Sequence, residues 1–465
     1  MVILDANIVL IALPTIIADL PGTDAFFGVW IIMGYILVTA TLLLTFGRLS
    51  DMVGRVRLYN LGFAVFTVGS ALCSLAQDGL SLVLFRLVQG AGGALLFSNN
   101  AALLTDVFPA TERGRALGLN RVAGAAGSVS GLVLGGILAG IPQLGWRSIF
   151  WINIPIGMFA TAWAYLKLRE MSEPRRGERL DPLGNVSFAV GLSVLLLGLT
   201  LGALLGWNLT LVGATAAGGL LMLAFIGIEM KVRSPMMDFS LFRIRAFSAG
   251  ILANLLGSIS RGALSLVLIF YFQGVLGLDA LTAGLMLVPF TVAFVTVGPL
   301  SGYLSDKYGS RSFATAGLLV GASALFLLSA LPFPLPYYEL LVPMVLAGIG
   351  GGLFVAPNVA SIMNATPPAR RGVASGMSST LVNSGFLLSL GFAFTILALG
   401  VPVSTLHAIF AGQTVAVGAI GVVQFVGSMR IVFFINGIIS LFAAGTAYLT
   451  KGRARVEPAG LGQAD

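Results

Sequence analysis

The stretch Gly47-Arg48-Leu49-Ser50-Asp51-Met52-Val53-Gly54-Arg55 separates two long apolar runs of the chain. The same frame returns 255 positions later as Gly302-Tyr303-Leu304-Ser305-Asp306-Lys307-Tyr308-Gly309. A charged turn between glycines, repeated at corresponding places in two halves of an apolar chain, is typical of a duplicated membrane transporter. One copy alone fits a solvated turn equally well, but two copies in register argue against that interpretation.

The residue types in this turn suggest how it works. Gly47 lets two helices approach closely, and Gly54 permits a tight turn. Asp51 can accept hydrogen bonds from free backbone N–H groups or from a neighbouring arginine. Arg55 and Arg57 then hold the loop on the cytoplasmic side of a membrane. We therefore expect a cytoplasmic gate made from both copies of the turn: Gly47, Asp51, Gly54, Arg55, Arg57 and Asp306.

The composition is that of an integral membrane protein. Of the 465 residues, 57% are hydrophobic and only 9% are charged, and the mean hydropathy is +0.99. Soluble domains carry roughly 25% charged residues. Apolar runs of about 20 residues predict an all-α protein with fourteen transmembrane helices: Val2–Ala18, Phe26–Phe46, Leu58–Ala76, Leu80–Leu104, Ala116–Ala139, Ile149–Leu168, Leu183–Leu205, Leu209–Met230, Phe247–Gln273, Leu281–Gly302, Phe313–Leu331, Tyr337–Met363, Val373–Leu399 and Arg430–Leu449.

The distribution of charge predicts the orientation. Loops on one side of these helices, together with the C-terminal tail, hold 22 of the 26 lysines and arginines. By the positive-inside rule, both termini are then cytoplasmic and the chain lies in the cell membrane. The net charge of +8 reflects this orientation, so we expect no nucleic-acid partner. Counting Val403–Phe425 as a fifteenth span would move the basic tail outside, so we expect that segment to be a long external loop that partly touches lipid.

Further repeats indicate how the helices are grouped. Gly90–Leu95 resembles Gly348–Leu353, and Arg113–Gly118 resembles Arg371–Gly376, each pair 258 positions apart. Helices 1–6 and 9–14 therefore form two parallel six-helix halves, and helices 7 and 8 are an inserted pair, a 6 + 2 + 6 arrangement. We expect an N-terminal half at 1–168, the inserted pair with cytoplasmic linkers at 169–245, a C-terminal half at 246–450 and a cytoplasmic tail at 451–465.

The opening motif, G-x-L-x-D-x-x-G-R, resembles the helix 2–3 loop signature of the major facilitator superfamily. The 6 + 2 + 6 layout resembles its fourteen-helix drug:proton antiporter branch, and the similarity runs from about residue 4 to residue 450. Several local stretches carry it: Leu4-Asp5 to Ala12-Leu13-Pro14 in helix 1, Arg86-x-x-Gln89-Gly90-x-Gly92-x-Ala94 in helix 4, Trp146–Gly157 at helix 6, and Ser234–Arg243 between helices 8 and 9.

The chain departs from the family pattern at three positions. The antiporter motif of helix 5, G-x3-G-P-x2-G-G, is present as Gly127, Gly131, Gly135 and Gly136, but Leu132 replaces its proline. The glycines still allow close helix packing, whereas the proline bend is missing. In helix 1, Asn7 stands where the family prefers threonine and Leu10 where it prefers asparagine. Transport is therefore better supported than antiport.

Asp5 is the carboxylate that we place inside a span. A buried acid is costly to keep ionised, so it can take up a proton and couple proton movement to substrate movement. The competing interpretation puts Asp5 at the cytoplasmic surface, because only four residues precede it. The repeat places Asp5 opposite Ser260–Ala263, well inside helix 9, so we expect either that the chain starts late or that helix 1 is short.

Two arginines lie in apolar surroundings. The resemblance implies that Arg86 in helix 4 takes part in proton coupling; a structural anchor is the alternative. Arg261 lies near the middle of helix 9, where an arginine costs roughly 2.5 to 3.5 kcal/mol. We expect Arg261 to face the central cavity and either to pair with Asp5 or to attract an anionic substrate group; a structural pairing with backbone carbonyls is the alternative. Gln89 and Asn7 are expected to join Arg261 in the cavity or substrate site.

The resulting hypothesis is a proton-coupled secondary transporter that exports small amphipathic or drug-like compounds by alternating access. Its partners would be a small-molecule substrate, protons and the lipid bilayer, and we expect a monomer with no cofactor and no metal. An importer or symporter of a small metabolite with the same fold is the main alternative, kept open by Leu132 and Arg261. The sequence does not suggest an enzyme, because it offers no nucleophile–base or metal cluster.

Overall fold

The computed structural model describes residues 1–109, 112–141, 145–170, 180–232, 235–332, 337–367 and 370–450. In this part of the chain, fourteen helical segments are long and apolar enough to cross a membrane. The predicted all-α fold is therefore confirmed. The expected tail at 451–465 and residues 171–179 of the first expected linker lie outside the described residues.

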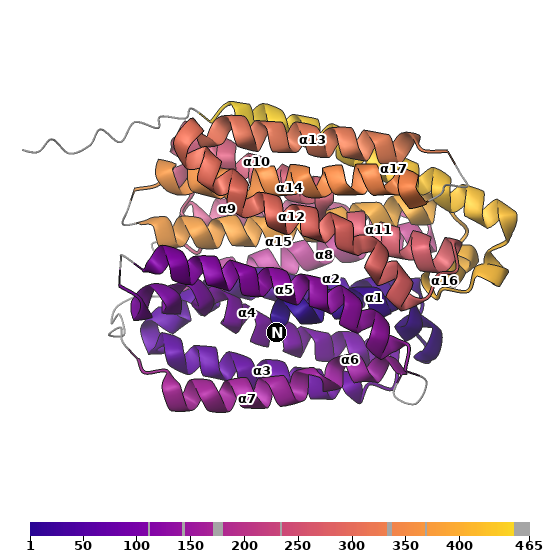
Figure 1. The fold of residues 1–465 in the computed structure, drawn as a ribbon, viewed down its shortest axis with the longest axis horizontal. Helices are drawn as coiled ribbons and strands as arrows, with labels where there is room; N and C mark the ends of the chain where they lie inside the picture. Colours follow the sequence, from indigo (N-terminus) through magenta and orange to yellow (C-terminus); the bar gives the residue numbers. More distant parts are fainter. Residues whose placement is uncertain are drawn as a thin grey trace, which may run out of the picture.

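The first six spans form one bundle, drawn in indigo to magenta in Figure 1. The sixth span is interrupted at Ile152, so that a 3-10 turn and two helices follow one another along it. The elements of this half are α1 (Val2–Asp19), α2 (Ala25–Val53), α3 (Arg55–Ser74), α4 (Gly79–Val107), α5 (Arg113–Ala139), η1 (Gly145–Arg147), α6 (Ser148–Trp151) and α7 (Asn153–Lys167).

The last six spans form the second bundle, pink through orange to yellow in Figure 1. Its first span is α10, α11 and a π-helical turn in succession, with a break at Ala263. The elements from the inserted pair onward are α8 (Pro182–Leu205), α9 (Leu209–Glu229), η2 (Phe239–Arg243), α10 (Arg245–Gly262), α11 (Leu264–Phe270), η3 (Tyr271–Val275), α12 (Ala280–Tyr308), α13 (Ser310–Ala330), α14 (Tyr337–Ala365), α15 (Arg371–Gly400), α16 (Val403–Phe410) and α17 (Thr414–Tyr448).

Helix α8 of the inserted pair connects the two halves. The Trp30 indole N–H in α2 donates to the Thr200 hydroxyl in α8 at 3.2 Å. On its other side, the Thr395 hydroxyl in α15 donates to the carbonyl oxygen of Leu199 in α8 at 3.4 Å. Helix α9 packs on α8 and is much more exposed, as expected for a helix that faces lipid. The pair therefore supports the interface between α2 and α15.

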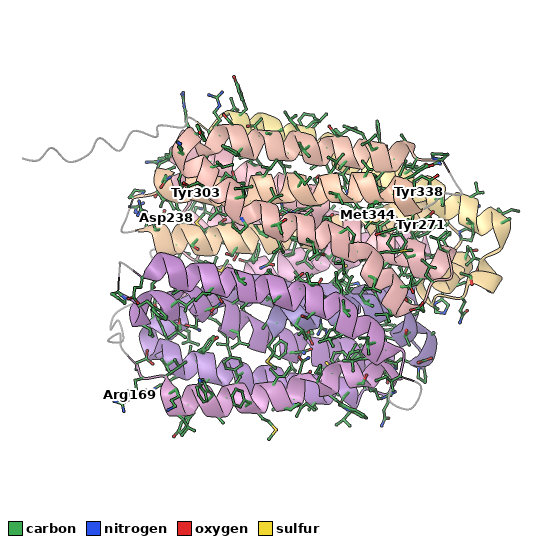
Figure 2. All side chains as sticks on the ribbon, viewed as in Figure 1. Arg169, Asp238, Tyr271, Tyr303, Tyr338 and Met344 are labelled. Atoms are coloured by element: carbon green, nitrogen blue, oxygen red, sulfur yellow. The ribbon has the colours of Figure 1, made fainter. Side chains whose placement is uncertain are left out.

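The two ends of the bundle differ. We call the end with the Asp51 and Asp306 loops the basic end and the opposite end the far end; in Figure 2, Arg169, Asp238 and Tyr303 mark the basic end, at the left. At the far end the halves are in close contact. A Cβ on Gly136 of α5 would lie 2.3 Å from the Cα of Leu281 in α12. The Gln273 side chain of η3 also donates to the Ile11 carbonyl of α1 at 2.9 Å.

The segment Val403–Phe425 does not form the long external loop that we expected. Residues Val403–Phe410 form α16, whose apolar face is buried, and Phe410 stacks on Phe270 with ring centroids 3.7 Å apart. Helix α17 then begins at Thr414, with a non-helical break at Gly418 (φ 65°). The expectation of a loop was wrong because this apolar run extends the last helix beyond one bilayer thickness. It adds no fifteenth crossing.

Candidate transport site

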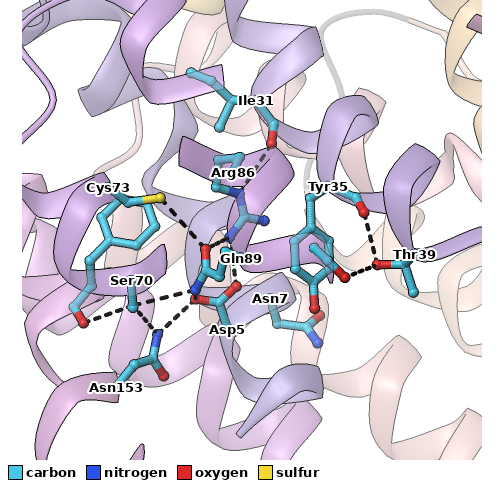
Figure 3. A network of polar contacts seen from close by, with 12 residues as sticks. Asp5, Asn7, Ile31, Tyr35, Thr39, Ser70, Cys73, Arg86, Gln89 and Asn153 are labelled. Atoms are coloured by element: carbon cyan, nitrogen blue, oxygen red, sulfur yellow. Dashed lines mark hydrogen bonds and ion pairs between the residues drawn. The ribbon is translucent and has the colours of Figure 1, made fainter. Parts of the chain in front are cut away.

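Asp5 lies in a buried polar network inside the N-terminal half (Figure 3). Its Oδ2 is 2.7 Å from a terminal nitrogen of Arg86, and Oδ1 accepts from the Gln89 amide at 2.9 Å and from the Asn153 amide at 2.7 Å. Asp5, Gln89 and Asn153 are each 0% exposed and Arg86 is 1% exposed. The fold thus brings together one carboxylate, one guanidinium and two amide side chains away from solvent.

The rest of the network fixes the position of the Arg86 guanidinium. Its Nε donates to the carbonyl oxygen of Ile31 in α2 at 3.2 Å, and a terminal nitrogen donates to Gln89 Oε1 at 2.6 Å. The guanidinium carbon lies 4.3 Å from the centre of the Tyr35 ring, which allows a cation–π contact. Ser70 of α3 accepts from the amides of Gln89 and Asn153. The network therefore ties α1 to α2, α3, α4 and α7.

Asp5 is buried although it stands in the first turn of α1. Helix α1 has 18 residues, whereas α2 and α4 have 29 each. The first residues of α1, Met1 and Val2, pack against a cluster of Tyr35 and Phe66 within the bundle. The surface position for Asp5 is therefore ruled out, because its side chain is 0% exposed.

Asn153, Ser70 and Tyr35 were missed by sequence reasoning. Asn153 lies in the stretch Trp146–Gly157 at helix 6. Its polar amide between apolar residues is the signal that could have identified it. Ser70 and Tyr35 carried no such signal, because single serines and tyrosines are common in membrane helices.

Arg261 lies apart from this network, between the two halves. It lines a smaller cavity of about 320 Å³ and a larger one of about 1,230 Å³. Its guanidinium contacts the Ser258 hydroxyl at 3.4 Å and lies 5.5 and 6.0 Å from the ring centres of Phe354 and Phe386. It forms no ion pair with any described residue. The alternative in which Arg261 pairs with Asp5 is not realised, because Asp5 pairs with Arg86.

Asn7 and Gln89 lie on different sides of this arrangement. Asn7 lines the smaller cavity, and its amide donates to the Ile3 carbonyl and to the Ser128 hydroxyl of α5. Two residues along a helix point about 200° apart, so Asn7 faces the cavity while Asp5 faces the N-terminal bundle. Gln89, which we expected in the cavity, lies instead beside Asp5 and lines neither cavity.

The first copy of the repeated turn forms a compact ionic cluster at the basic end. Arg55 pairs with Asp51 and with Asp106 of α4, each at 2.8 Å. Glu170, directly after the sixth span, accepts from the backbone N–H groups of Arg55 and Val56 at 2.8 and 3.0 Å, and so caps the start of α3. Neither Asp106 nor Glu170 was predicted, because each lies at or just after the C-terminal end of a helix, where no capping pattern points to an acidic residue.

The glycines of this turn have distinct roles. Gly54 has a φ of 125°, which other residues rarely adopt, and a Cβ there would lie 2.7 Å from a Glu170 oxygen. Gly47 lines the larger cavity, where a Cβ would lie 4.0 Å from Ser98. Arg57 is exposed, and its Cδ lies 3.5 Å from the point that a Cβ on Gly54 would occupy.

The second copy of the turn has no such cluster. Gly309 again adopts a positive φ, of 92°, and ends α12. Asp306, however, is exposed and makes no ion pair or hydrogen bond with a described side chain. The sequence explains the difference, because Ser310 stands where the first copy has Arg55, and Asn364 stands where α4 has Asp106.

The glycines of the helix 5 motif are contact points for two other helices. A Cβ on Gly131 would lie 2.7 Å from the Leu4 carbonyl oxygen, and one on Gly135 would lie 3.0 Å from the Ile8 Cα, so both face α1. A Cβ on Gly127 would lie 3.8 Å from the Leu4 nitrogen, and Gly136 faces α12. Helix α5 therefore fits between the helix that bears Asp5 and the other half.

Two six-helix halves, an inserted pair and a cavity between the halves define a secondary transporter of the membrane. The sequence matches the Major Facilitator Superfamily over residues 1–390 and again over 250–464. The chain belongs to that superfamily, and its fourteen spans agree with the fourteen-helix branch that the motifs resemble.

Two relatives and one solved structure illustrate the similarity. The riboflavin transporter RibZ of Clostridioides difficile is 33% identical over 392 residues, which cover 84% of each chain. The cephamycin export protein CmcT of Amycolatopsis lactamdurans is 34% identical over 409 residues, 86% of this chain and 83% of the relative. A bacterial homologue of the human lysosomal transporter Spinster has a TM-score of 0.66 at 18% identity, covering 96% and 94% of the two chains, which shows the shared fold.

Proposed function

We propose that this chain is a proton-coupled secondary transporter that exports small amphipathic compounds from the cytoplasm. The observation that carries the proposal is the ion pair of Asp5 and Arg86, fully buried among helices of the N-terminal half. In such surroundings, adding a proton to the acid changes the local energy far more than it would at the surface.

The proton-coupled step follows from that burial. Protonation of Asp5 removes the negative charge and leaves the Arg86 guanidinium with only Gln89, the Ile31 carbonyl and the Tyr35 ring as partners. Removing one partner of a buried ion pair typically costs about 3–5 kcal/mol. A rearrangement of α1 against α4 that rehydrates Arg86 relieves this cost. Because α1 also packs on α5, such a shift reaches the contact between the halves.

Alternating access assigns roles to the two ends. The far end is sealed by α5 against α12, whereas the larger cavity opens between the halves at the basic end. We assign the basic end to the cytoplasm by the positive-inside rule. In this conformation the substrate therefore enters from the cytoplasm, and the cluster of Asp51, Arg55 and Asp106 stands ready to close that side.

A drug-sensitive bacterial strain that lacks its main efflux pumps provides the test. Expression should raise resistance to some members of a panel of growth inhibitors, and Asp5→Asn should abolish that resistance. For each such compound, a protonophore should raise its accumulation in cells expressing the intact protein. Asp19→Asn, an exposed acid at the other end of α1, is the matched control and should retain resistance. Export that continues without any ion gradient would contradict proton coupling.

Proton-coupled import of a small metabolite is the second candidate. It is favoured by Leu132 in place of the motif's proline and by the similarity to a protein named as a riboflavin transporter. Oriented membrane vesicles with an imposed pH gradient separate the two candidates. Export predicts that the substrate moves against the proton flux, and import predicts that both move in the same direction.

A further inference from the structure

Arg261 holds a positive charge near the middle of the span Arg245–Val275 without an acidic partner among the described residues. An arginine at such a depth is costly. The helix dipole at the last turn of α10 and the two aromatic faces each offset only part of that cost. The charge therefore also depends on hydration from the two cavities that it lines.

This dependence restricts which ligands the cavity accepts. A molecule that enters the smaller cavity displaces water from Arg261. If it brings no hydrogen-bond acceptor, it leaves a charged donor without a partner, which is strongly unfavourable. A cation adds repulsion to that cost. A ligand with an anionic group replaces the lost hydration with a charge-assisted hydrogen bond, which arginine forms especially well with planar carboxylates.

The walls of the smaller cavity define the rest of the ligand. Phe290, Phe294, Phe354 and Phe386 line it together with several leucines, and among its described lining residues none is acidic. Its few polar groups include Asn7 and the hydroxyls of serine and threonine residues. Such walls fit an apolar, and preferably aromatic, body.

The larger cavity, which leads from the basic end to Arg261, also has more positively than negatively charged lining residues. The larger cavity is lined by Arg48, Arg55 and Arg261, with Asp51 as its one acidic lining residue in the described chain. Asp51 and Asp106 of α4 both pair with Arg55, so Arg48 and Arg261 carry the positive charge of this lining. A channel lined in this way raises the local concentration of anions.

We propose that the central cavity binds small organic anions, each with an apolar body and one carboxylate or sulfonate group, and that Arg261 is the residue that recognises the charge. The proposal names the substrate class of the transporter proposed above and rests on that function. It excludes lipophilic cations as preferred substrates.

Three compounds with one ring system test this inference directly: 1-naphthylacetate as the anion, 1-naphthylacetamide as the neutral analogue and 1-naphthylmethylammonium as the cation. Their binding to the purified full-length protein in lipid nanodiscs is measured by equilibrium dialysis at neutral pH, without any gradient. We expect the anion to bind at least about ten-fold more tightly than the other two, a difference of about 1.4 kcal/mol.

Variants locate the preference. Arg261→Gln should lower the affinity for the anion to that for the amide, while Arg261→Lys should retain part of the preference. Ser323→Ala, at an exposed position of α13 outside both cavities, is the control and should leave the preference intact. Tighter binding of the ammonium compound, or an unchanged preference in a folded Arg261→Gln protein, would overturn the proposal. If Arg261→Gln fails to fold, the comparison of the three compounds on the intact protein and on Arg261→Lys decides.

The outcome is independent of proton coupling. If the intact protein shows no preference for the anion but its export is sensitive to a protonophore, this inference alone is overturned. Anion preference combined with export that ignores the proton gradient would overturn the proposed coupling alone.

Discussion

The buried charges of this protein are compensated in three different ways. Asp5 and Arg86 compensate each other and are further held by amides. Arg261 lies near two aromatic rings and lines two cavities. Asp181 and Glu229, at the basic ends of α8 and α9, face each other as two buried acids. Each arrangement predicts a different response when one charge is removed.

The Asp5–Arg86 pair predicts a non-additive effect on stability. Asp5→Asn leaves Arg86 buried without its counter-ion, so the protein should lose about 3–5 kcal/mol of stability. The double variant Asp5→Asn with Arg86→Gln removes both charges and should recover most of that loss, yet it should remain uncoupled. Thermal unfolding of the purified proteins in one detergent measures the order of their stabilities. A double variant less stable than Asp5→Asn would show that the pair is not the source of the loss.

Asp181 and Glu229 predict the opposite behaviour. Asp181 Oδ2 and Glu229 Oε1 are buried without a described hydrogen-bond partner. A Cβ on Gly184 would lie 2.6 Å from Asp181 Oδ2 and 2.2 Å from Glu229 Oε1. Two facing carboxylates are stable when they share a proton. Glu229→Gln supplies an N–H in place of that proton and still offers an oxygen to the Met237 amide, so the melting temperature should be unchanged or higher.

A steric control accompanies that variant. Gly184→Ala places a methyl group against both carboxyl oxygens and should lower the melting temperature. If Glu229→Gln destabilises as strongly as Gly184→Ala does, the two acids do not share a proton.

Residue chemistry explains which parts of the candidate site could be predicted. Asp5, Arg86 and Arg261 were found because a charge within an apolar run has few explanations. The pairing of Asp5 with Arg86 rather than Arg261, and the placement of Gln89 outside the cavity, depend on how each helix is rotated. Hydropathy does not contain that information, because all faces of these helices are apolar.

At the scale of whole elements, run length predicted the spans well and the irregular segments poorly. The first span of the second half was expected as one helix, Phe247–Gln273, but it breaks at Ala263, whose N–H is then satisfied by the Ser389 hydroxyl at 2.9 Å. A partner 126 positions away is not visible in local sequence. The helix starts, by contrast, follow ordinary capping chemistry, with Asp24, Asp78, Asp181 and Asp279 each accepting from a backbone N–H.

The cap of α12 predicts a pH dependence. Asp279 accepts hydrogen bonds from the hydroxyl and the N–H of Thr282, which lower the pKa of its carboxyl below the ordinary value. Because the folded pKa is the lower one, the cap stabilises the protein above about pH 4 and loses this contribution as the pH falls through the folded pKa. Asp279→Ala should therefore cost about 1 kcal/mol near neutral pH and progressively less in acid.

Melting temperatures from pH 7 to pH 3 measure the effect as the difference between the intact protein and Asp279→Ala. Asp279→Asn keeps a capping oxygen that does not titrate, so its stability relative to Asp279→Ala should not depend on pH. A gap between intact protein and Asp279→Ala that widens in acid would contradict the assignment.

At the scale of the whole molecule, the structure combines a closed far end with an open basic end. The far-end seal consists of close backbone contacts at Gly136 and Gly284, the hydrogen bond from Gln273 to the Ile11 carbonyl and α16 packed against η3. None of these contacts is an ion pair, so they can separate without leaving a buried charge. The basic end, in contrast, carries the partly buried ion pairs of Arg55 with Asp51 and Asp106. Such a division suits a molecule that must open each end in turn.

Opening at the basic end predicts a one-sided pattern of chemical labelling. Ser379 of α15 is exposed and lines the larger cavity. A membrane-impermeant thiol reagent should therefore modify Ser379→Cys rapidly in inside-out vesicles and slowly in intact cells. Gln77→Cys, in the exposed far-end loop between α3 and α4, is the matched control and should show the reverse. The native Cys73 is buried and should contribute little background. Equal labelling of Ser379→Cys from both sides would mean that the far end is not sealed, and labelling from outside alone would reverse the orientation assigned to the chain.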